Sequence, residues 1–125
     1  MQIDAIDHVV LTVRSMPASI AFYTHVLGMR EVNFGDNRKA LAFGTSKLNL
    51  HEAGREHEPK AHPAPGAIDL CLLTQTPMAE ILSHLADQHI EVELGPVTRT
   101  GAQGPLRSVY LRDPDGNLIE LSNPL

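Results

Sequence analysis

The order of strand and helix patterns repeats within this chain, and this repeat limits the possible fold more than any other feature of the sequence. Residues 6–13 are β-branched and aliphatic and form too short a run for a helix, which predicts a strand. A helix is then predicted to open at Ser15, with Pro17 in its first turn, and to stop at Gly28. Three further strands, separated by turn residues, are predicted at 30–34, 39–43 and 47–52.

The second half of the chain repeats this order. A strand at 67–73 precedes a helix that Thr76 is expected to cap, with Pro77 at its first position. Strands are predicted at 90–94, 107–112 and 117–122, and a tight turn at 113–116 joins the last two. The connector at 53–66 and the segment at 95–105 are rich in Gly and Pro, which predicts loops. The pattern is that of one α+β domain made of two βαβββ halves, at about 3–53 and 66–125.

Corresponding residues of the two halves identify the positions that the repeat makes equivalent. His8 falls on Asp69 at a separation of about 61 residues, and His51 falls on Glu120 at about 69. The increase is predicted to reflect a loop insertion within 95–105. A pseudo-twofold pairing of the halves is expected to bring these four side chains toward a common axis.

Alternation along the strands divides each predicted sheet into two faces. One face is aliphatic and is expected to pack against the helices; it consists of Val9, Leu11, Val13, Leu48, Leu50, Ile68, Leu70, Leu72, Ile119 and Leu121. The other face is mixed and includes the four equivalent residues. The single cysteine, Cys71, lies in the apolar run 68–73 and is predicted to be a buried core thiol.

Imidazoles and carboxylates at equivalent positions predict a site for a divalent metal. His8, His51 and Glu120 are the expected ligands. Asp69 is expected either to bind the metal or to accept a hydrogen bond from a ligand imidazole. Zn, Ni, Mn, Co and Fe(II) all suit this set, because no thiolate in it enforces zinc.

Composition excludes several other functions. The net charge of −5, from 10 basic and 15 acidic residues, offers no field for binding phosphates, so nucleic acid is not an expected partner. No apolar run reaches the length of a bilayer span or follows a basic N-terminal stretch, which predicts a cytoplasmic protein without membrane contact. Arg99, Arg107, Arg112 and Lys60 are possible contacts for an anionic substrate, although such residues are more often simply solvated.

Several motifs together resemble the vicinal oxygen chelate superfamily, which includes glyoxalase I, fosfomycin-resistance proteins, extradiol dioxygenases and bleomycin-binding proteins. The motifs are the opening Asp-His-Val-Val-Leu at 7–11, Phe-Tyr at 22–23 with Val-Leu-Gly-Met at 26–29, and Asp-Pro-Asp-Gly-Asn-Leu-Ile-Glu-Leu at 113–121. Together with the repeat, they extend the likeness over nearly the whole chain. The stretch at 48–52 and His62-Pro63 look closest to small single-domain glyoxalase-like proteins.

The resemblance implies two modules that pair into an incomplete eight-stranded barrel around a metal site, commonly in a homodimer. His8 matches the family's first-strand histidine ligand, and Glu120 matches its last-strand glutamate. Two positions depart from the pattern: His51 stands where glyoxalase I has a glutamate, and Asp69 where glyoxalase I and the fosfomycin enzymes have a histidine. These departures weaken any transfer of substrate, because reaction type follows the site and not the fold.

Three functions remain open for a small-molecule substrate or ligand. The first is a metal-dependent lyase or isomerase of the glyoxalase type, in which Glu120 or Asp69 acts as the base. The second is an extradiol-type dioxygenase, because His8, His51 and Glu120 also form a two-histidine, one-carboxylate set suited to Fe(II). The third is a binding protein of the resistance type that performs no chemistry.

Overall fold

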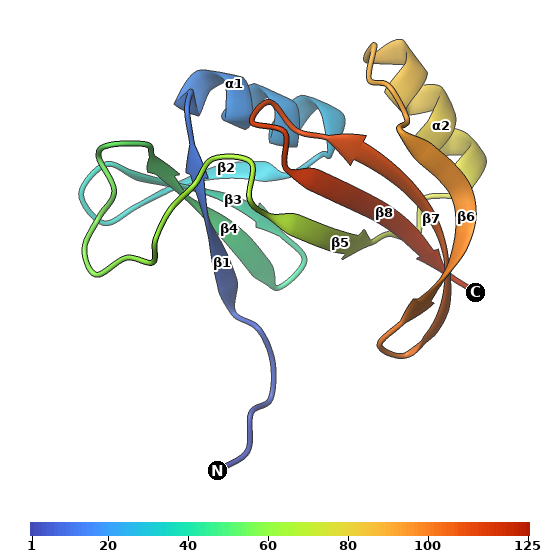
Figure 1. Ribbon diagram of the computed structural model, residues 1–125, viewed down its shortest axis with the longest axis horizontal. Helices are drawn as coiled ribbons and strands as arrows, with labels where there is room; N and C mark the ends of the chain where they lie inside the picture. Colours follow the sequence, from blue (N-terminus) through green and yellow to red (C-terminus); the bar gives the residue numbers. More distant parts are fainter. The chain divides into compact units, whose positions relative to one another are not determined.

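A computed structural model describes all residues, 1–125, and divides the chain into two units, Met1–Pro65 and Gly66–Leu125. Unit 1 contains β1 (His8–Val13), α1 (Met16–Ala21), η1 (Phe22–Val26), β2 (Arg30–Phe34), β3 (Arg38–Phe43) and β4 (Ser46–Glu52). Unit 2 contains β5 (Asp69–Leu73), α2 (Met78–Asp87), β6 (Leu94–Gly101), β7 (Gly104–Arg112) and β8 (Leu118–Pro124). Each unit has a helical segment followed by three strands in a meander (Figure 1).

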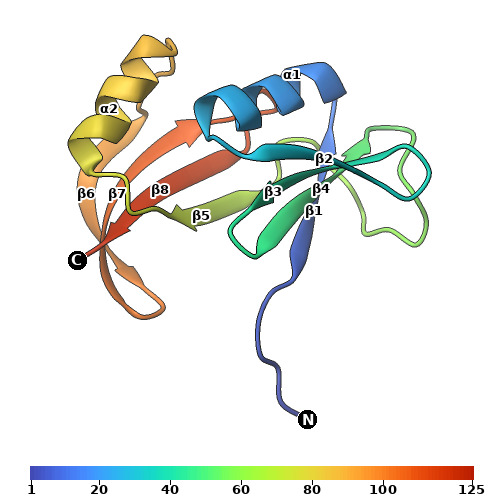
Figure 2. The same cartoon turned by 180° about the vertical axis from the view of Figure 1, so that it is seen from behind.

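The two sheets have the same topology. The strand order is β1-β4-β3-β2 in unit 1 and β5-β8-β7-β6 in unit 2. In both sheets the first strand pairs in parallel with the last, and the remaining pairs are antiparallel. The α+β class and the two βαβββ modules are therefore confirmed, with two separate four-stranded sheets (Figure 2).

The helix of unit 1 begins and ends as the sequence predicts. The Ser15 hydroxyl accepts a hydrogen bond from the Ala18 N–H at 3.2 Å, which satisfies one of the free donors at the helix start. The end is a Schellman motif: Gly28 has φ 71°, the Gly28 N–H donates to the Thr24 carbonyl, and the Met29 N–H donates to the Tyr23 carbonyl. One difference is that the second half, η1, is a π-helix and not an α-helix.

Two local predictions in unit 2 are wrong. Thr76 does not cap α2; Pro77 is the N-cap residue and offers no side-chain hydrogen bond. Residues 90–93 do not form a strand; β6 begins at Leu94, and the Gly- and Pro-rich segment taken for a loop contains the rest of β6 and its hairpin with β7. Because β6 is an edge strand with a register shift between Leu94 and Val97, Pro96 removes no hydrogen bond of a regular ladder.

The aliphatic face of each sheet contributes to the core. Residues less than 10% exposed include Leu11, Val13, Leu48, Leu50, Ile119 and Leu121 from the predicted set. The other predicted members, Val9, Ile68, Leu70 and Leu72, are half-buried. Tyr23 is completely buried and contacts the ring of Phe22 edge to face at 5.1 Å.

No helix of the chain is both long enough and apolar enough to span a bilayer.

Candidate functional site

The face of the unit 1 sheet opposite the aliphatic one carries both predicted histidine ligands, but at different positions along the strands. In the parallel pairing of β1 with β4, His8 stands opposite Lys47, Val10 opposite Asn49, and Thr12 opposite His51. Paired residues share a face, so His8 and His51 lie on the same side of the sheet. Four residues of register separate them, which corresponds to about 13 Å along a strand.

The register also corrects the predicted equivalence of His51 and Glu120. In unit 2 Glu120 stands opposite Cys71, two residues after Asp69 on β5. In unit 1 the residue opposite the position two after His8 is Asn49. Asn49 is therefore the counterpart of Glu120, and the predicted match with His51 is wrong by two residues.

His8 has the hydrogen bonding typical of a metal-binding imidazole. Its Nδ1 lies 2.8 Å from Asp7 Oδ1, so the carboxylate favours the tautomer in which Nδ1 carries the proton. The lone pair of Nε2 is then available to a ligand, and the carboxylate also fixes the orientation of the ring. The His8 side chain is 42% exposed, so this nitrogen is accessible.

Asn49 is a candidate that sequence reasoning missed, because only histidines and carboxylates were considered as ligands. Its side chain is 5% exposed, and its Oδ1 is buried without a hydrogen-bond partner. A buried acceptor left in this way costs about 1–3 kcal/mol, and a cation or a donor on a ligand removes that cost. The position of Asn49 between Leu48 and Leu50 was the available signal: a polar residue in an aliphatic run.

His51 lies in a basic environment of its own. The Arg38 Nη2–H donates to His51 Nε2 at 3.3 Å, and the ring of His57 is 5.4 Å away. Burial lowers the pKa of His51, and the Arg38 charge lowers it further, so the imidazole is neutral at pH 7. Arg38, which the sequence did not single out, also has a buried Nε without a partner. His51 as a metal ligand stays a prediction, and binding through Nε2 requires Arg38 to give way.

Glu120 in unit 2 is held by a pair of buried hydroxyls. The Ser122 hydroxyl donates to Glu120 Oε2 at 3.2 Å, and the Ser108 and Ser122 Oγ atoms are 2.6 Å apart. Ser122 gives its single proton to Glu120, so Ser108 is the donor to Ser122. Both serines are completely buried. One carboxylate oxygen is thereby fixed on the wall that it shares with Cys71.

Cys71 lies beside this carboxylate and is not the buried core thiol that the sequence predicted. It is exposed, because β5 directs Leu70 and Leu72 to the apolar face and Cys71 to the other. Its Sγ is 3.4 Å from Ser122 Oγ. Partial burial of the sulfur raises the pKa of the thiol, so Cys71 is protonated at neutral pH. Asp69, at the start of the same strand, is also exposed.

A cavity of about 420 Å³ opens on this face of unit 2. It is lined by Cys71, Leu73, Arg99, Thr100, Gly101, Ala102, Leu106, Tyr110 and Glu120. Its volume is within the range of small-molecule sites, and its walls are mostly apolar with a few polar groups. Glu120 thus belongs to the wall of a ligand-sized cavity, which the sequence could not show.

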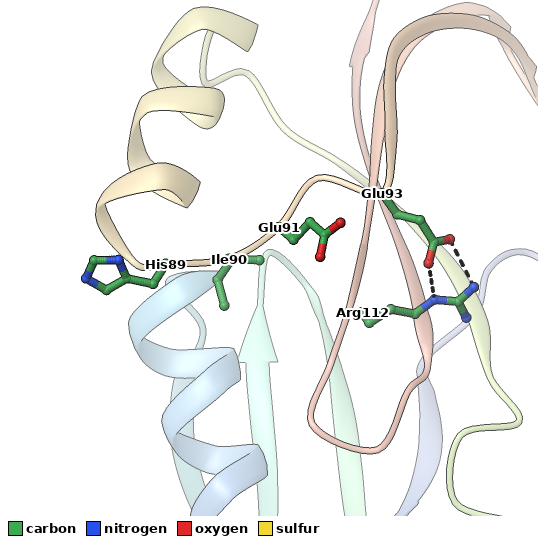
Figure 3. A pocket seen from close by; sticks show the side chains of 5 residues that line it. All are labelled: His89, Ile90, Glu91, Glu93 and Arg112. Atoms are coloured by element: carbon green, nitrogen blue, oxygen red, sulfur yellow. Dashed lines mark hydrogen bonds and ion pairs between the residues drawn. The ribbon is translucent and has the colours of Figure 1, made fainter.

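A second cavity in unit 2, of about 190 Å³, is lined by His89, Ile90, Glu91, Glu93 and Arg112 (Figure 3). Its lining includes Arg112, whose Nε and Nη2 each donate to one oxygen of Glu93 at 3.0 Å. Figure 3 shows the Glu93 carboxylate and the Arg112 guanidinium turned toward each other. Arg112 is therefore not the free cation that an anionic substrate needs.

The donor types in the two units bear on whether the chain suits a divalent metal. Nowhere do three His, Cys, Asp or Glu side chains of the chain form a metal-binding group. The side chains with an available lone pair are the His8 imidazole, the Asn49 amide oxygen and the carboxylates of Asp69 and Glu120. Imidazole nitrogen and carboxylate or amide oxygen are ligand types that Mn, Fe(II), Co, Ni and Zn accept, so the donor types of each unit fit.

Comparisons with known proteins agree with this fold. The family model described as Glyoxalase/Bleomycin resistance protein/Dioxygenase superfamily matches residues 5–121. Virulence protein STM3117 of Salmonella typhimurium is 53% identical over 98% of this chain and 85% of its own length, and its crystal structure superposes with a TM-score of 0.98 over all of both chains. Glyoxalase domain-containing protein RDO1 of Mycosarcoma maydis is 51% identical over 98% of this chain and 70% of its own. Lactoylglutathione lyase from Agrobacterium tumefaciens is 25% identical, with a TM-score of 0.76 over 98% of this chain and 95% of its own.

Proposed function

Because this chain belongs to the Glyoxalase/Bleomycin resistance protein/Dioxygenase superfamily, we propose that it is a divalent-metal-dependent lyase or isomerase acting on a small molecule with two adjacent oxygens. Members of this superfamily include both enzymes and small-molecule-binding proteins. The choice of an isomerase rests on one observation, the fixed carboxylate of Glu120 in the wall of the unit 2 cavity.

Glu120 is suited to move a proton between adjacent carbons. Its Oε2 is held by Ser122, which sets the direction of the carboxylate, and the protonated Cys71 thiol beside it also hydrogen-bonds to the carboxylate. A carboxylate held in this way takes a proton from one substrate carbon and returns it to the next, so the reaction needs no other reactant. The apolar part of the cavity wall, including Leu73 and Leu106, lowers the local polarity and favours that transfer.

We propose that His8 and Asn49 are the metal ligands of unit 1 and that Asp69 and Glu120 are those of unit 2. Here Asn49 replaces His51 in the predicted set, since it is the counterpart of Glu120 and its oxygen lacks a partner. A bound divalent cation supplies Lewis-acid stabilisation of negative charge on the substrate oxygens. His51 then serves beside the site as a neutral imidazole paired with Arg38.

The test combines metal analysis with proton exchange. Purified protein is loaded with Zn, Ni, Mn, Co or Fe(II) and given thiol adducts of 1,2-dicarbonyls, and loss of the substrate C–H signal in D₂O is followed by NMR. We expect about one metal per chain, reduced in His8→Ala and Asn49→Ala but kept in His51→Ala. Glu120→Gln should slow proton exchange by about 10² or more.

The matched control is Glu91→Gln, which removes an exposed carboxylate of the same unit away from the cavity with Glu120. Its exchange rate should stay within about twofold of the parent protein. An unchanged rate in Glu120→Gln sinks the isomerase proposal. Ring cleavage of a catechol by the anaerobically Fe(II)-loaded protein instead shows the dioxygenase activity.

One observation favours binding without catalysis as a second candidate. Asn49 places an uncharged amide where unit 2 has the carboxylate of Glu120, and this reduces the negative charge available to a cation. If the protein takes up no metal under any loading condition but binds small molecules in the unit 2 cavity, the binding function is the correct one.

A further inference from the structure

Arg99 is a cation of the unit 2 cavity that is held in place but not neutralised. Its Nε donates to the Tyr110 hydroxyl at 3.0 Å and its Nη1 to the Thr98 carbonyl at 3.3 Å. The guanidinium also lies 5.5 Å from the centre of the Tyr110 ring, a stabilising cation–π distance. These contacts use two of the five N–H groups and leave three.

No carboxylate forms an ion pair with Arg99, in contrast to Arg112 of the same sheet, which Glu93 neutralises. The partners of Arg99 are a phenol and a carbonyl, which orient the guanidinium but carry no negative charge. A guanidinium of this kind in a cavity wall is arranged to bind a carboxylate through two parallel hydrogen bonds.

Tyr110 links this cation to the carboxylate of the proposed reaction. It stands directly opposite Glu120 in the pairing of β7 with β8, and its hydroxyl accepts from Arg99. The side chains of Leu73, Ala102 and Leu106 complete the wall. The cavity therefore has a cationic group, an apolar wall and a carboxylate, arranged around one tyrosine.

We infer that Arg99 binds the carboxylate of the substrate and that the cavity selects a small monocarboxylic acid with an apolar body and an oxygen-bearing carbon next to its acid group. This inference rests on the proposed function, because it assigns the substrate class of the same site. A carboxylate fits better than a phosphate: one free guanidinium balances one negative charge, and Glu120 in the same wall repels a dianion.

The experiment compares three probes by isothermal titration calorimetry on the protein as purified. The probes are phenylglyoxylate, its uncharged methyl ester and phenylphosphonate. We expect phenylglyoxylate to bind about tenfold tighter than the ester and tighter than the phosphonate, with a preference that weakens as salt is raised. Arg99→Met, which keeps the apolar stem, should bring the ratio of acid to ester close to one.

Two further variants separate charge from structure. Tyr110→Phe removes the hydroxyl that orients Arg99 and should reduce the ratio by about threefold while retaining the ring. The control is Arg107→Met on β7, an exposed arginine one residue from Leu106 and so on the opposite face; its ratio should equal that of the parent. Far-ultraviolet circular dichroism confirms that each variant is folded.

The inference is overturned if the acid and ester bind equally, if Arg99→Met keeps the preference, if phenylphosphonate binds tightest, or if no probe binds. These results are independent of turnover. Proton exchange that depends on Glu120 without any acid preference leaves the proposed function standing and removes the inference. A preference for the acid without any Glu120-dependent proton exchange leaves the inference about Arg99 standing and removes the proposed function.

Discussion

The two units share a topology but present opposite chemistry on the sheet face away from the apolar core. In unit 1 that face carries five basic or potentially basic side chains and no carboxylate; they are His8, Arg30, Arg38, Lys47 and His51. In unit 2 it carries two carboxylates, Asp69 and Glu120, together with Arg99 and Arg112, and Glu93 neutralises Arg112. The comparison shows that the βαβββ module fixes where side chains stand, while their identities decide which half attracts anions and which attracts cations.

The apolar faces of the two units differ in how completely their side chains are buried. Substitutions on these faces are expected to give the largest change in the free energy of unfolding. Leu11 in unit 1 is completely buried, whereas its counterpart Leu72 in unit 2 is half-buried. Leu11→Ala should lower the free energy of unfolding by about 3–4 kcal/mol, because it leaves a cavity in packed surroundings, and Leu72→Ala by about 1–2 kcal/mol. Urea denaturation with unchanged m-values tests this, and equal losses would contradict the difference in packing.

Substitutions in the turns that precede the last strand of each unit should differ by nearly as much in their effect on the free energy of unfolding. In unit 2 Asp113 Oδ1 accepts from the backbone N–H groups of Asp115 and Asn117 at 2.9 Å, and Oδ2 accepts from Asn117 Nδ2 at 2.8 Å. Asp113→Ala leaves buried donors unpaired and should cost about 3 kcal/mol. The matched change Thr45→Ala, in the short exposed turn of unit 1, should cost less than about 0.5 kcal/mol. Comparable thermal shifts in the two variants would argue against this.

Making unit 1 more like unit 2 should strengthen metal binding. Asn49→Asp places a carboxylate at the counterpart of Glu120, and it is expected to tighten the binding of Mn or Zn by about tenfold, since an anionic ligand replaces a neutral one. The same variant without metal should be less stable, because it buries a charge near apolar residues. Weaker metal binding in Asn49→Asp would remove Asn49 from the proposed ligand set. His51→Asp is the control, because it places a carboxylate on the same face of β4 but two residues further along the strand.

The smallest effect concerns the one strong ion pair of unit 2, and it depends on pH. The hydrogen bonds from Arg112 lower the pKa of Glu93 below its usual 4.5. A lowered folded-state pKa means that the stabilisation is complete above pH 4.5 and is lost as the pH falls through the folded-state value. The melting temperature of Glu93→Gln should lie slightly below that of the parent at pH 7, and the two should converge as the pH falls below the folded-state pKa of Glu93, which is lower than 4.5. A constant difference across this range would show that the pair contributes no charge-dependent stability.

Sequence reasoning succeeded where local patterns determine the outcome. The strand over 30–34, the helix start at Ser15 and stop at Gly28, and the turn at 113–116 are each decided by neighbouring residues, and the structure has all three. It failed at 95–105, because Gly and Pro usually end strands. The pairing with β7 nevertheless supports an edge strand with an irregular register there.

For the candidate site, the sequence determined the chemical types and the faces, while the tertiary structure decided the partners. Alternation shows that His8, His51 and Glu120 avoid the apolar face, because the side-chain period of a strand is two. The same period cannot distinguish Asn49 from His51, which are two residues apart and point to the same side. That choice was made by hydrogen bonding between β1 and β4. The orphaned Asn49 oxygen, the buried serines behind Glu120 and the unpaired Arg99 likewise arise from contacts between strands that are distant in the chain.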